Sequence, residues 1–112
     1  MAPRSVAFAW LPVVAWAGVI FALSSIPGLG TGLGVWDLVL RKLAHVAEYA
    51  VLGLLLARAV RTAAALALGV AYAVTDEVHQ AFVAGRQGSP LDVAVDAVGV
   101  LLGVAAYRRL VR

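Results

Sequence analysis

Ionisable residues recur at one-turn spacing in two otherwise apolar stretches of the chain. His45 and Glu48 form the first pair, and Asp76 and His79 form the second. In an α-helix, side chains three positions apart lie one turn apart on the same face. An imidazole and a carboxylate placed this way can exchange protons with a substrate, because the carboxylate orients the ring. These two pairs are therefore the first candidates for a functional site.

Cationic side chains lie close to both pairs in the sequence. Lys42 precedes His45 by one helical turn, and Arg86 follows the second pair within a Gly-containing connection. Arginine binds a phosphate group through two parallel hydrogen bonds, whereas lysine binds it as a point charge. This pattern indicates a site for an anionic group, with an acid–base pair made of His45 and either Glu48 or Asp76. The predicted catalytic or binding residues are Lys42, His45, Glu48, Asp76, Gln80, Arg86 and Asp92.

The same pairs allow a second hypothesis, in which the site holds a divalent metal ion. Four-helix bundles that bind two metals use a related Glu-x-x-His spacing on facing helices. The chain contains no cysteine, so only oxygen and nitrogen ligands are available, and Mg, Mn or Zn are the candidate ions. The predicted ligands are His45, Glu48, Asp76 and His79.

The composition of the chain predicts a membrane environment for these groups. Of its 112 residues, 63% are hydrophobic and only 13% are charged, whereas a soluble domain has about 45–50% apolar and about 25% charged residues. A chain of this size cannot bury so much apolar surface in one core. The net charge is +3, but the sequence has no basic run interleaved with aromatic residues, so no nucleic-acid partner is expected.

Four hydrophobic segments follow one another along the chain, at residues 6–23, 37–60, 62–82 and 91–110. The connections after the first and third segments contain Gly and Pro, which disfavour a helix there. The first segment is uncharged and close to the length of about 20 residues with which a helix spans a bilayer. The sequence therefore predicts an all-α fold: a single polytopic membrane domain over residues 1–112, with four transmembrane helices in a small bundle.

The second, third and fourth segments reach membrane length only if their ionisable residues are part of the span. Exposure of a charged group to lipid is costly, so these residues are expected to face protein or a water-filled cavity. In the fourth segment, one helical stripe carries Asp92, Asp96, Gly99 and Gly103. Because small residues allow helices to approach closely in lipid, this stripe is predicted to be the packing face of the helix.

The distribution of Arg and Lys predicts the orientation of the bundle. With four spans, the short second connection lies on the same side as both termini. This side carries Arg4, Arg58, Arg61, Arg108, Arg109 and Arg112. The positive-inside rule makes it cytoplasmic, so both termini are predicted inside. The polar halves of the last three helices then converge at the level of the outer leaflet.

Three stretches of the sequence together match a known pattern: KLAHVAEYAVLGLLL, DEVHQAFVAGRQGSPLDVAVDAVGVLLG and LSSIPG. Over residues 23–103 the chain resembles the VanZ-like family, which is named for a membrane protein linked to teicoplanin resistance. The family usually has Asn at the position of Asp96. The polar residues that match the family pattern are Lys42, His45, Tyr49, Asp76, Glu77, Gln80, Arg86, Ser89 and Asp92.

This resemblance implies a small helical membrane protein of the bacterial cell envelope, associated with glycopeptide (teicoplanin) resistance. Together with the residues above, it leads to the hypothesis that an outer-leaflet polar site binds or modifies an anionic membrane lipid, such as a polyprenyl-phosphate, or a cell-wall precursor. The alternative is a non-enzymatic role, as a proton or solute pathway or as a docking partner in the membrane. Four helices make a narrow path, so a pathway would require a homo-oligomer.

Overall fold

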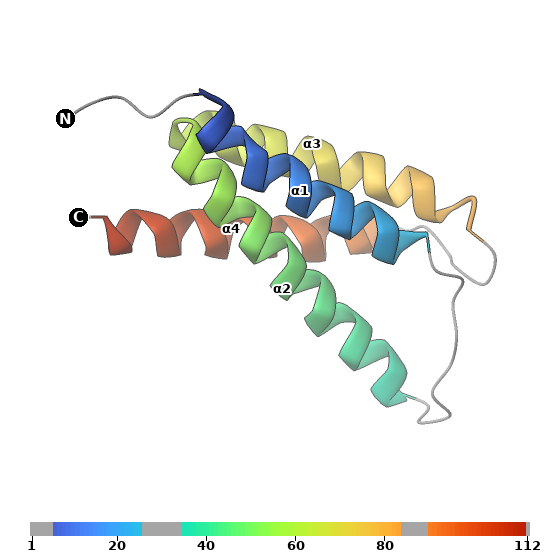
Figure 1. The fold of residues 1–112 in the computed structure, drawn as a ribbon. Helices are drawn as coiled ribbons and strands as arrows, with labels where there is room; N and C mark the ends of the chain where they lie inside the picture. The colour runs from blue at the N-terminus through green and yellow to red at the C-terminus, as the bar shows by residue number, and fades with distance from the viewer. Residues whose placement is uncertain (1–5, 26–34, 84–89, 112) are drawn as a thin grey trace.

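The computed structural model describes residues 6–25, 35–83 and 90–111, and this part of the chain is entirely helical (Figure 1). Its four helices are α1 (Val6–Ser24), α2 (Val35–Ala59), α3 (Thr62–Gln80) and α4 (Pro90–Leu110). They begin and end close to the four predicted hydrophobic segments, so the all-α prediction is confirmed. Most of the two Gly- and Pro-containing connections lies outside the described residues.

Local sequence signals account for the helix ends. α4 begins at Pro90, a residue suited to the first helical position because its fixed φ matches the helix and its missing N–H has no partner there anyway. Ser89, which precedes Pro90, lies outside the described residues. Asp92 in the first turn of α4 and Arg108 in the last turn interact favourably with the helix dipole. Between α2 and α3, Arg61 adopts an extended backbone conformation, which reverses the direction of the chain.

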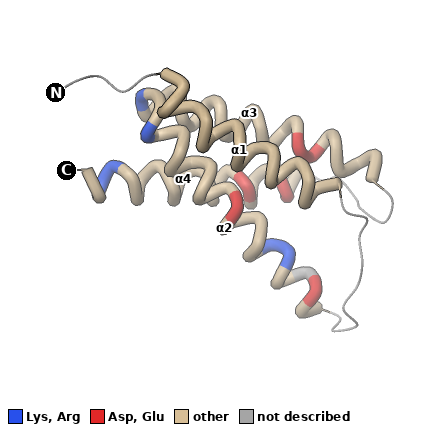
Figure 2. The backbone as a smooth tube through the Cα atoms, in the orientation of Figure 1, with Lys and Arg blue, Asp and Glu red and all other residues tan. Residues whose placement is uncertain are grey.

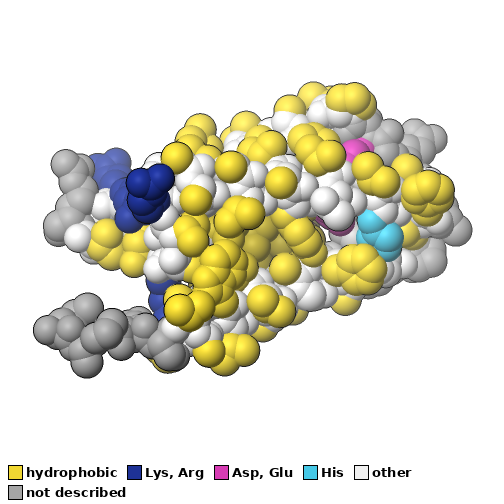
Figure 3. Space-filling model, turned by 90° about the horizontal axis from the view of Figure 1, so that it is seen from above, with side chains coloured by type: hydrophobic (Ala, Val, Ile, Leu, Met, Phe, Trp, Pro, Cys, Tyr) yellow, Lys and Arg dark blue, Asp and Glu magenta, His cyan; other side chains and the backbone are white. Residues whose placement is uncertain are grey.

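The surface of the bundle is apolar where a soluble protein would be polar. Figure 3 shows hydrophobic side chains spread over the face that it views, between basic side chains at one end and acidic and histidine side chains at the other. Helices α1 and α4 are long and apolar enough to cross a membrane, and only 11% and 28% of these stretches is buried inside the bundle. A core helix of a soluble protein would be mostly buried, so these exposures favour a membrane protein. The predicted crossing of α2 and α3 stays a prediction.

The four helices are arranged around the contact between α2 and α4, the most extensive in the bundle. α1 packs on α2 and α3, and α3 also packs on α4. The start of α1, the turn between α2 and α3, and the end of α4 lie at one end of the bundle (Figure 1). We call this the basic end, because it carries Arg58, Arg61, Arg108 and Arg109. The acidic residues lie away from it (Figure 2).

Glycine allows α4 to approach α2 at backbone distance. A Cβ atom on Gly99 would lie 2.6 Å from the carbonyl oxygen of Val46, and one on Gly103 would fall onto the carbonyl oxygen of Ala50. These glycines lie on the stripe of α4 that also carries Asp92 and Asp96. The predicted packing face of α4 is therefore the one that the structure uses. Towards the basic end from the aspartates, the core consists of apolar side chains, including Leu52, Leu56, Val100 and Val104.

Candidate functional site

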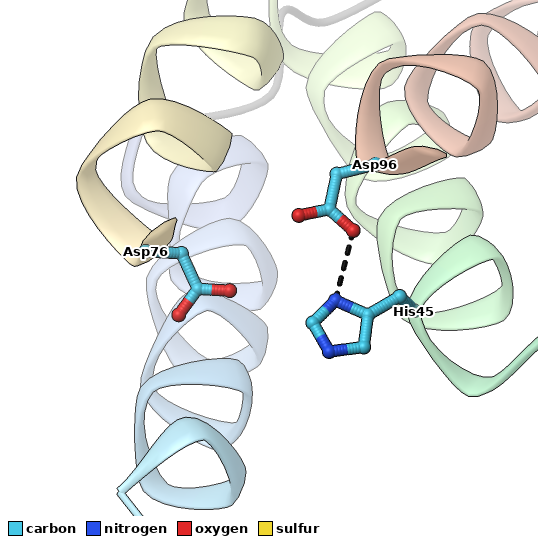
Figure 4. Close-up of side chains that lie close together, drawn as sticks. All are labelled: His45, Asp76 and Asp96. Carbon is cyan, nitrogen blue, oxygen red and sulfur yellow. Dashed lines mark hydrogen bonds and ion pairs between the residues drawn. The ribbon is translucent and has the colours of Figure 1, made fainter. Parts of the chain in front are cut away.

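The close contact between α2 and α4 places His45 opposite Asp96. The Nδ1 atom of His45 lies 2.9 Å from Oδ1 of Asp96 (Figure 4). Asp96 is only 1% exposed, and His45 is partly buried. A hydrogen bond of this kind fixes the orientation of the imidazole ring and leaves its second nitrogen for another partner.

Asp76 brings a second buried carboxylate from α3 to the same place. It is 4% exposed, and the hydroxyl of Tyr49 donates a hydrogen bond of 2.9 Å to its Oδ2 atom. Its other oxygen, Oδ1, is buried and has no hydrogen-bond partner among the described residues. The three side chains of His45, Asp76 and Asp96 gather between α2, α3 and α4 (Figure 4), and one nitrogen or oxygen atom from each lies within 4.8 Å of the others. We call these three residues the triad.

An ion pair between Lys42 and Asp92 lies next to the triad along the same helices. Each partner is one helical turn from a triad residue, Lys42 before His45 on α2 and Asp92 before Asp96 on α4. The two predicted site residues therefore neutralise each other. As a result, the ammonium group of Lys42 is engaged by a carboxylate and is not a free phosphate ligand.

A pocket of about 190 Å³ opens beside His45. Its walls come from three helices and combine apolar surface with hydrogen-bonding groups. The amide of Gln80 donates a weak hydrogen bond of 3.4 Å to the hydroxyl of Ser24, and both side chains are buried. The lining residues are Leu23, Ser24, Arg41, Ala44, His45, Glu48 and Gln80. The lining residues thus bring a guanidinium, an amide, a hydroxyl, an imidazole and the carboxylate of Glu48 together within a partly apolar surface.

Two hydrogen bonds fasten α1 to the neighbouring helices. The indole Nε1 of Trp16 donates to the carbonyl oxygen of Glu48 at 2.8 Å, and the hydroxyl of Tyr72 donates to the carbonyl oxygen of Ala17 at 2.6 Å. Each bond joins α1 to a different helix, the first to α2 and the second to α3. The wall that α1 contributes is therefore fixed relative to the helices that carry the triad.

Comparison with known proteins shows that a family model described as VanZ/LLP1 matches residues 4–112. The chain belongs to the VanZ/LLP1 family. The resemblance drawn from the sequence motifs is thereby confirmed. No curated protein and no solved structure matches the chain. The triad and the pocket both lie within the part that the family covers.

The structure brings together most of the residues that the sequence singled out in this VanZ/LLP1 member. Within the described part of the chain, each predicted catalytic or binding residue belongs to the triad, to the ion pair or to the pocket. Those residues are Lys42, His45, Glu48, Asp76, Gln80 and Asp92. Arg86, the remaining predicted residue, lies outside the described residues.

The four metal ligands predicted from the sequence are divided between different surroundings. His45 and Asp76 belong to the triad, whereas Glu48 lines the pocket. The ring of His79 stacks on Phe21 of α1, with the ring centroids 4.3 Å apart, and its Nε2 atom lies 3.4 Å from the hydroxyl of Ser25. Among the described residues, neither Glu48 nor His79 joins the close group of ligand atoms, and Asp96 occupies that role instead.

Sequence reasoning missed three residues of the site. Asp96 was placed on the packing stripe of its helix but was not included among the site residues. Arg41 was not among the predicted site residues, and Ser24 lay just beyond the end of the first predicted segment. The LSSIPG motif contains Ser24 and was a signal that could have identified it, because a polar residue at the end of an apolar helix is free to face its neighbours.

Proposed function

We propose that this VanZ/LLP1 protein is a membrane protein of the bacterial cell envelope that binds the anionic headgroup of a lipid or lipid-linked cell-wall precursor. A polyprenyl-phosphate is the type of ligand that the chemistry fits. The observation that carries the proposal is the pocket, where Arg41, Ser24 and Gln80 converge beside His45. Arginine suits a phosphate because its planar fork makes two parallel hydrogen bonds, and neutral donors add to this without a further charge.

The surroundings of the pocket suit a lipid better than a soluble anion. Leu23 forms part of its wall and is itself exposed, and Leu40 and Leu43 flank Arg41 with large exposed apolar surfaces. Acyl or prenyl chains can cover these side chains while the headgroup enters the pocket. A soluble phosphate compound would leave the same apolar surface uncovered.

The chemistry at the pocket wall supports modification of the bound headgroup as well as binding. His45 lines the pocket, and its Nδ1 atom is held by the carboxylate of Asp96. An imidazole oriented by a carboxylate is a common general acid or base, since the carboxylate stabilises the protonated ring. Asp96 takes the orienting role that the sequence suggested for Glu48 or Asp76. In this proposal His45 can transfer a proton to or from the bound headgroup only while its ring holds no metal ion.

A proton or solute pathway through one chain has weaker support. The buried polar side chains among the described residues are Ser24, Asp76, Gln80 and Asp96. All four lie near the ends of α1, α3 and α4 that are remote from the basic end. Between them and the basic end, the core is apolar, so a polar path would have to continue along an interface between chains.

Lipid binding in nanodiscs tests the proposal. We expect the native chain to bind a fluorescent polyprenyl phosphate more tightly than an uncharged polyprenol, and Arg41→Gln to lose most of that preference. Arg109→Gln is the matched control, because Arg109 is an exposed arginine at the basic end. Equal binding of the phosphate by both variants would refute the pocket as the headgroup site.

The link to glycopeptide resistance has a cellular test. In a host where the native chain changes susceptibility to teicoplanin, the double variant Arg41→Ala, His45→Ala is expected to return susceptibility to that of the host alone. Arg109→Ala is expected to behave as the native chain. Unchanged resistance with the double variant, at equal membrane levels of protein, would separate the pocket from the phenotype.

A further inference from the structure

Two buried carboxylates lie beside a pocket that is suited to an anion. Asp76 on α3 and Asp96 on α4 are almost completely buried. The lysine or arginine of α2 that is nearest to His45 in the sequence is Lys42, one turn before it. Lys42 is paired with Asp92 and so does not compensate the triad. Like charges repel strongly where water is excluded, so these carboxylates oppose the approach of a phosphate. A positive charge bound between them would remove this conflict.

The triad has the composition and spacing of a metal site. One ligand atom each from His45, Asp76 and Asp96 lies within 4.8 Å of the others, and two of these residues already have atoms 2.9 Å apart. Ligands of one ion lie about 3–3.5 Å from each other when each is about 2.0–2.2 Å from the metal. A bound ion would therefore draw the three side chains closer together than they lie in this structure.

An unpartnered oxygen points to a ligand independently of this spacing. Oδ1 of Asp76 is buried and accepts no hydrogen bond from the described residues, and the side chain of Asp76 extends from α3 on the side that faces His45 and Asp96 (Figure 4). A buried polar atom without a partner is costly, and such atoms in native proteins frequently mark an ion or water site. The hydroxyl of Tyr49 holds the other oxygen, as outer-sphere groups hold the carboxylates that bind metals.

We propose that His45, Asp76 and Asp96 bind one divalent cation, Mn²⁺ or Zn²⁺, at the inner wall of the pocket. One imidazole nitrogen among carboxylate oxygens favours these ions over Mg²⁺, which prefers oxygen ligands alone. Three protein ligands leave open positions on the ion for an oxygen of the ligand. Binding of the ion does not require a lipid. Its role of attracting a phosphate headgroup rests on the proposed function above.

Ion binding is measured on the full chain in nanodiscs of phosphatidylcholine, whose headgroup has no net charge. The protein is freed of metal with a chelator that is then removed, and Zn²⁺ or Mn²⁺ is added while empty nanodiscs serve as the blank. We expect about one ion per chain and a higher thermal midpoint in the presence of the ion. Binding of well under one ion per chain, with no shift of the midpoint, would overturn the proposal.

Matched variants distinguish the triad from other ligand sets. Asp96→Asn keeps the shape and a hydrogen-bond acceptor, and it is expected to weaken ion binding by more than about tenfold. His45→Gln is expected to do the same. His79→Gln changes a histidine of α3 outside both the triad and the pocket, and it is expected to bind the ion as the native chain does.

Each result bears on one conclusion. Native affinity in Asp96→Asn, or loss of binding in His79→Gln, would refute the triad as the ligand set. If Asp96→Asn does not fold, His45→Gln provides the comparison, and the native titration still decides whether an ion binds. If the native chain binds no ion but its binding of the lipid still depends on Arg41, the proposed cation site is refuted and the proposed headgroup site is not. If the native chain binds the ion but shows no Arg41-dependent binding of the lipid, the proposed headgroup site is refuted and the proposed cation site is not.

Discussion

Replacement of Gly103 by alanine is a direct test of the helix contact that builds the site. The added Cβ atom would fall onto the carbonyl oxygen of Ala50 and would lie 2.8 Å from the backbone nitrogen of Leu54. Both atoms belong to the backbone of α2, so no side-chain rotation can relieve the overlap. α4 must move away from α2, and the contact that holds Asp96 against His45 must loosen with it.

The size of the effect follows from two opposing contributions. Overpacking at a well-packed contact costs about 1–3 kcal/mol, whereas exchange of glycine for alanine inside a helix stabilises by about 0.5–1 kcal/mol. At Gly18 on α1, no atom lies within 4 Å of the added Cβ, so only the favourable contribution applies. We therefore expect Gly103→Ala to lower the free energy of unfolding and Gly18→Ala to raise it. The helix contribution is common to both variants, so the difference between them is the overpacking cost of about 1–3 kcal/mol.

The assay is reversible unfolding in mixed micelles, in which the fraction of sodium dodecyl sulfate is increased and the fluorescence of the three tryptophans is followed. The two variants are expected to move the midpoint in opposite directions. The same preparations of Gly103→Ala should also bind Zn²⁺ more weakly, because Asp96 moves with α4. If Gly103→Ala and Gly18→Ala unfolded at the same detergent fraction, the close crossing of α2 and α4 would be refuted.

Two further predictions concern the triad and the orientation of the chain. Tyr49→Phe removes the hydrogen bond to Asp76 and leaves both oxygens of a buried carboxylate without a partner, so it is expected to lower the free energy of unfolding by about 1–3 kcal/mol in the same micelle titration. Tyr107→Phe, near the basic end, is the control, and an equal loss in both variants would contradict the role given to this hydrogen bond. The chain has no cysteine, so single cysteines report topology without background. Ser25→Cys at the end of α1 is expected to react with an impermeant maleimide added to intact cells, and Ala63→Cys near the basic end is expected not to react. The opposite labelling would invert the predicted orientation.

The helices and their packing faces could be predicted because they depend on signals local to each segment. Apolar runs bounded by Gly, Pro and Arg set the four helices, and the order of Asp92, Asp96, Gly99 and Gly103 identified the face of α4 that meets α2. A charge in an apolar helix must face protein or water, so the convergence of polar residues was also predictable.

The partners within the site could not be predicted, because they depend on how far one helix slides along another. His45 is bonded to Asp96, since α4 crosses α2 at the depth that its glycines allow. Asp76 and His79 are one turn apart on α3, yet Asp76 belongs to the triad and the ring of His79 stacks on Phe21 of α1. A helix in a bundle contacts two neighbours at once, so residues that share its polar side can meet different partners.

The buried carboxylate of Asp76 offers a test of whether this group serves the stability of the bundle or the proposed ion site. The other buried groups of the site have partners: Asp96 contacts His45, and Gln80 contacts Ser24. Replacement of Asp76 by asparagine removes a charge that repels Asp96 and keeps an acceptor for the hydroxyl of Tyr49. Without metal, Asp76→Asn is therefore expected to unfold at a detergent fraction equal to or higher than that of the native chain. The corresponding gain in the free energy of unfolding is about 1 kcal/mol or less. With Zn²⁺ present, the order should reverse, because only the native chain gains stability from the bound ion. A metal-free Asp76→Asn that is clearly less stable than the native chain would mean that the carboxylate serves the fold itself, and a buried charge kept for ligand binding would no longer explain its position.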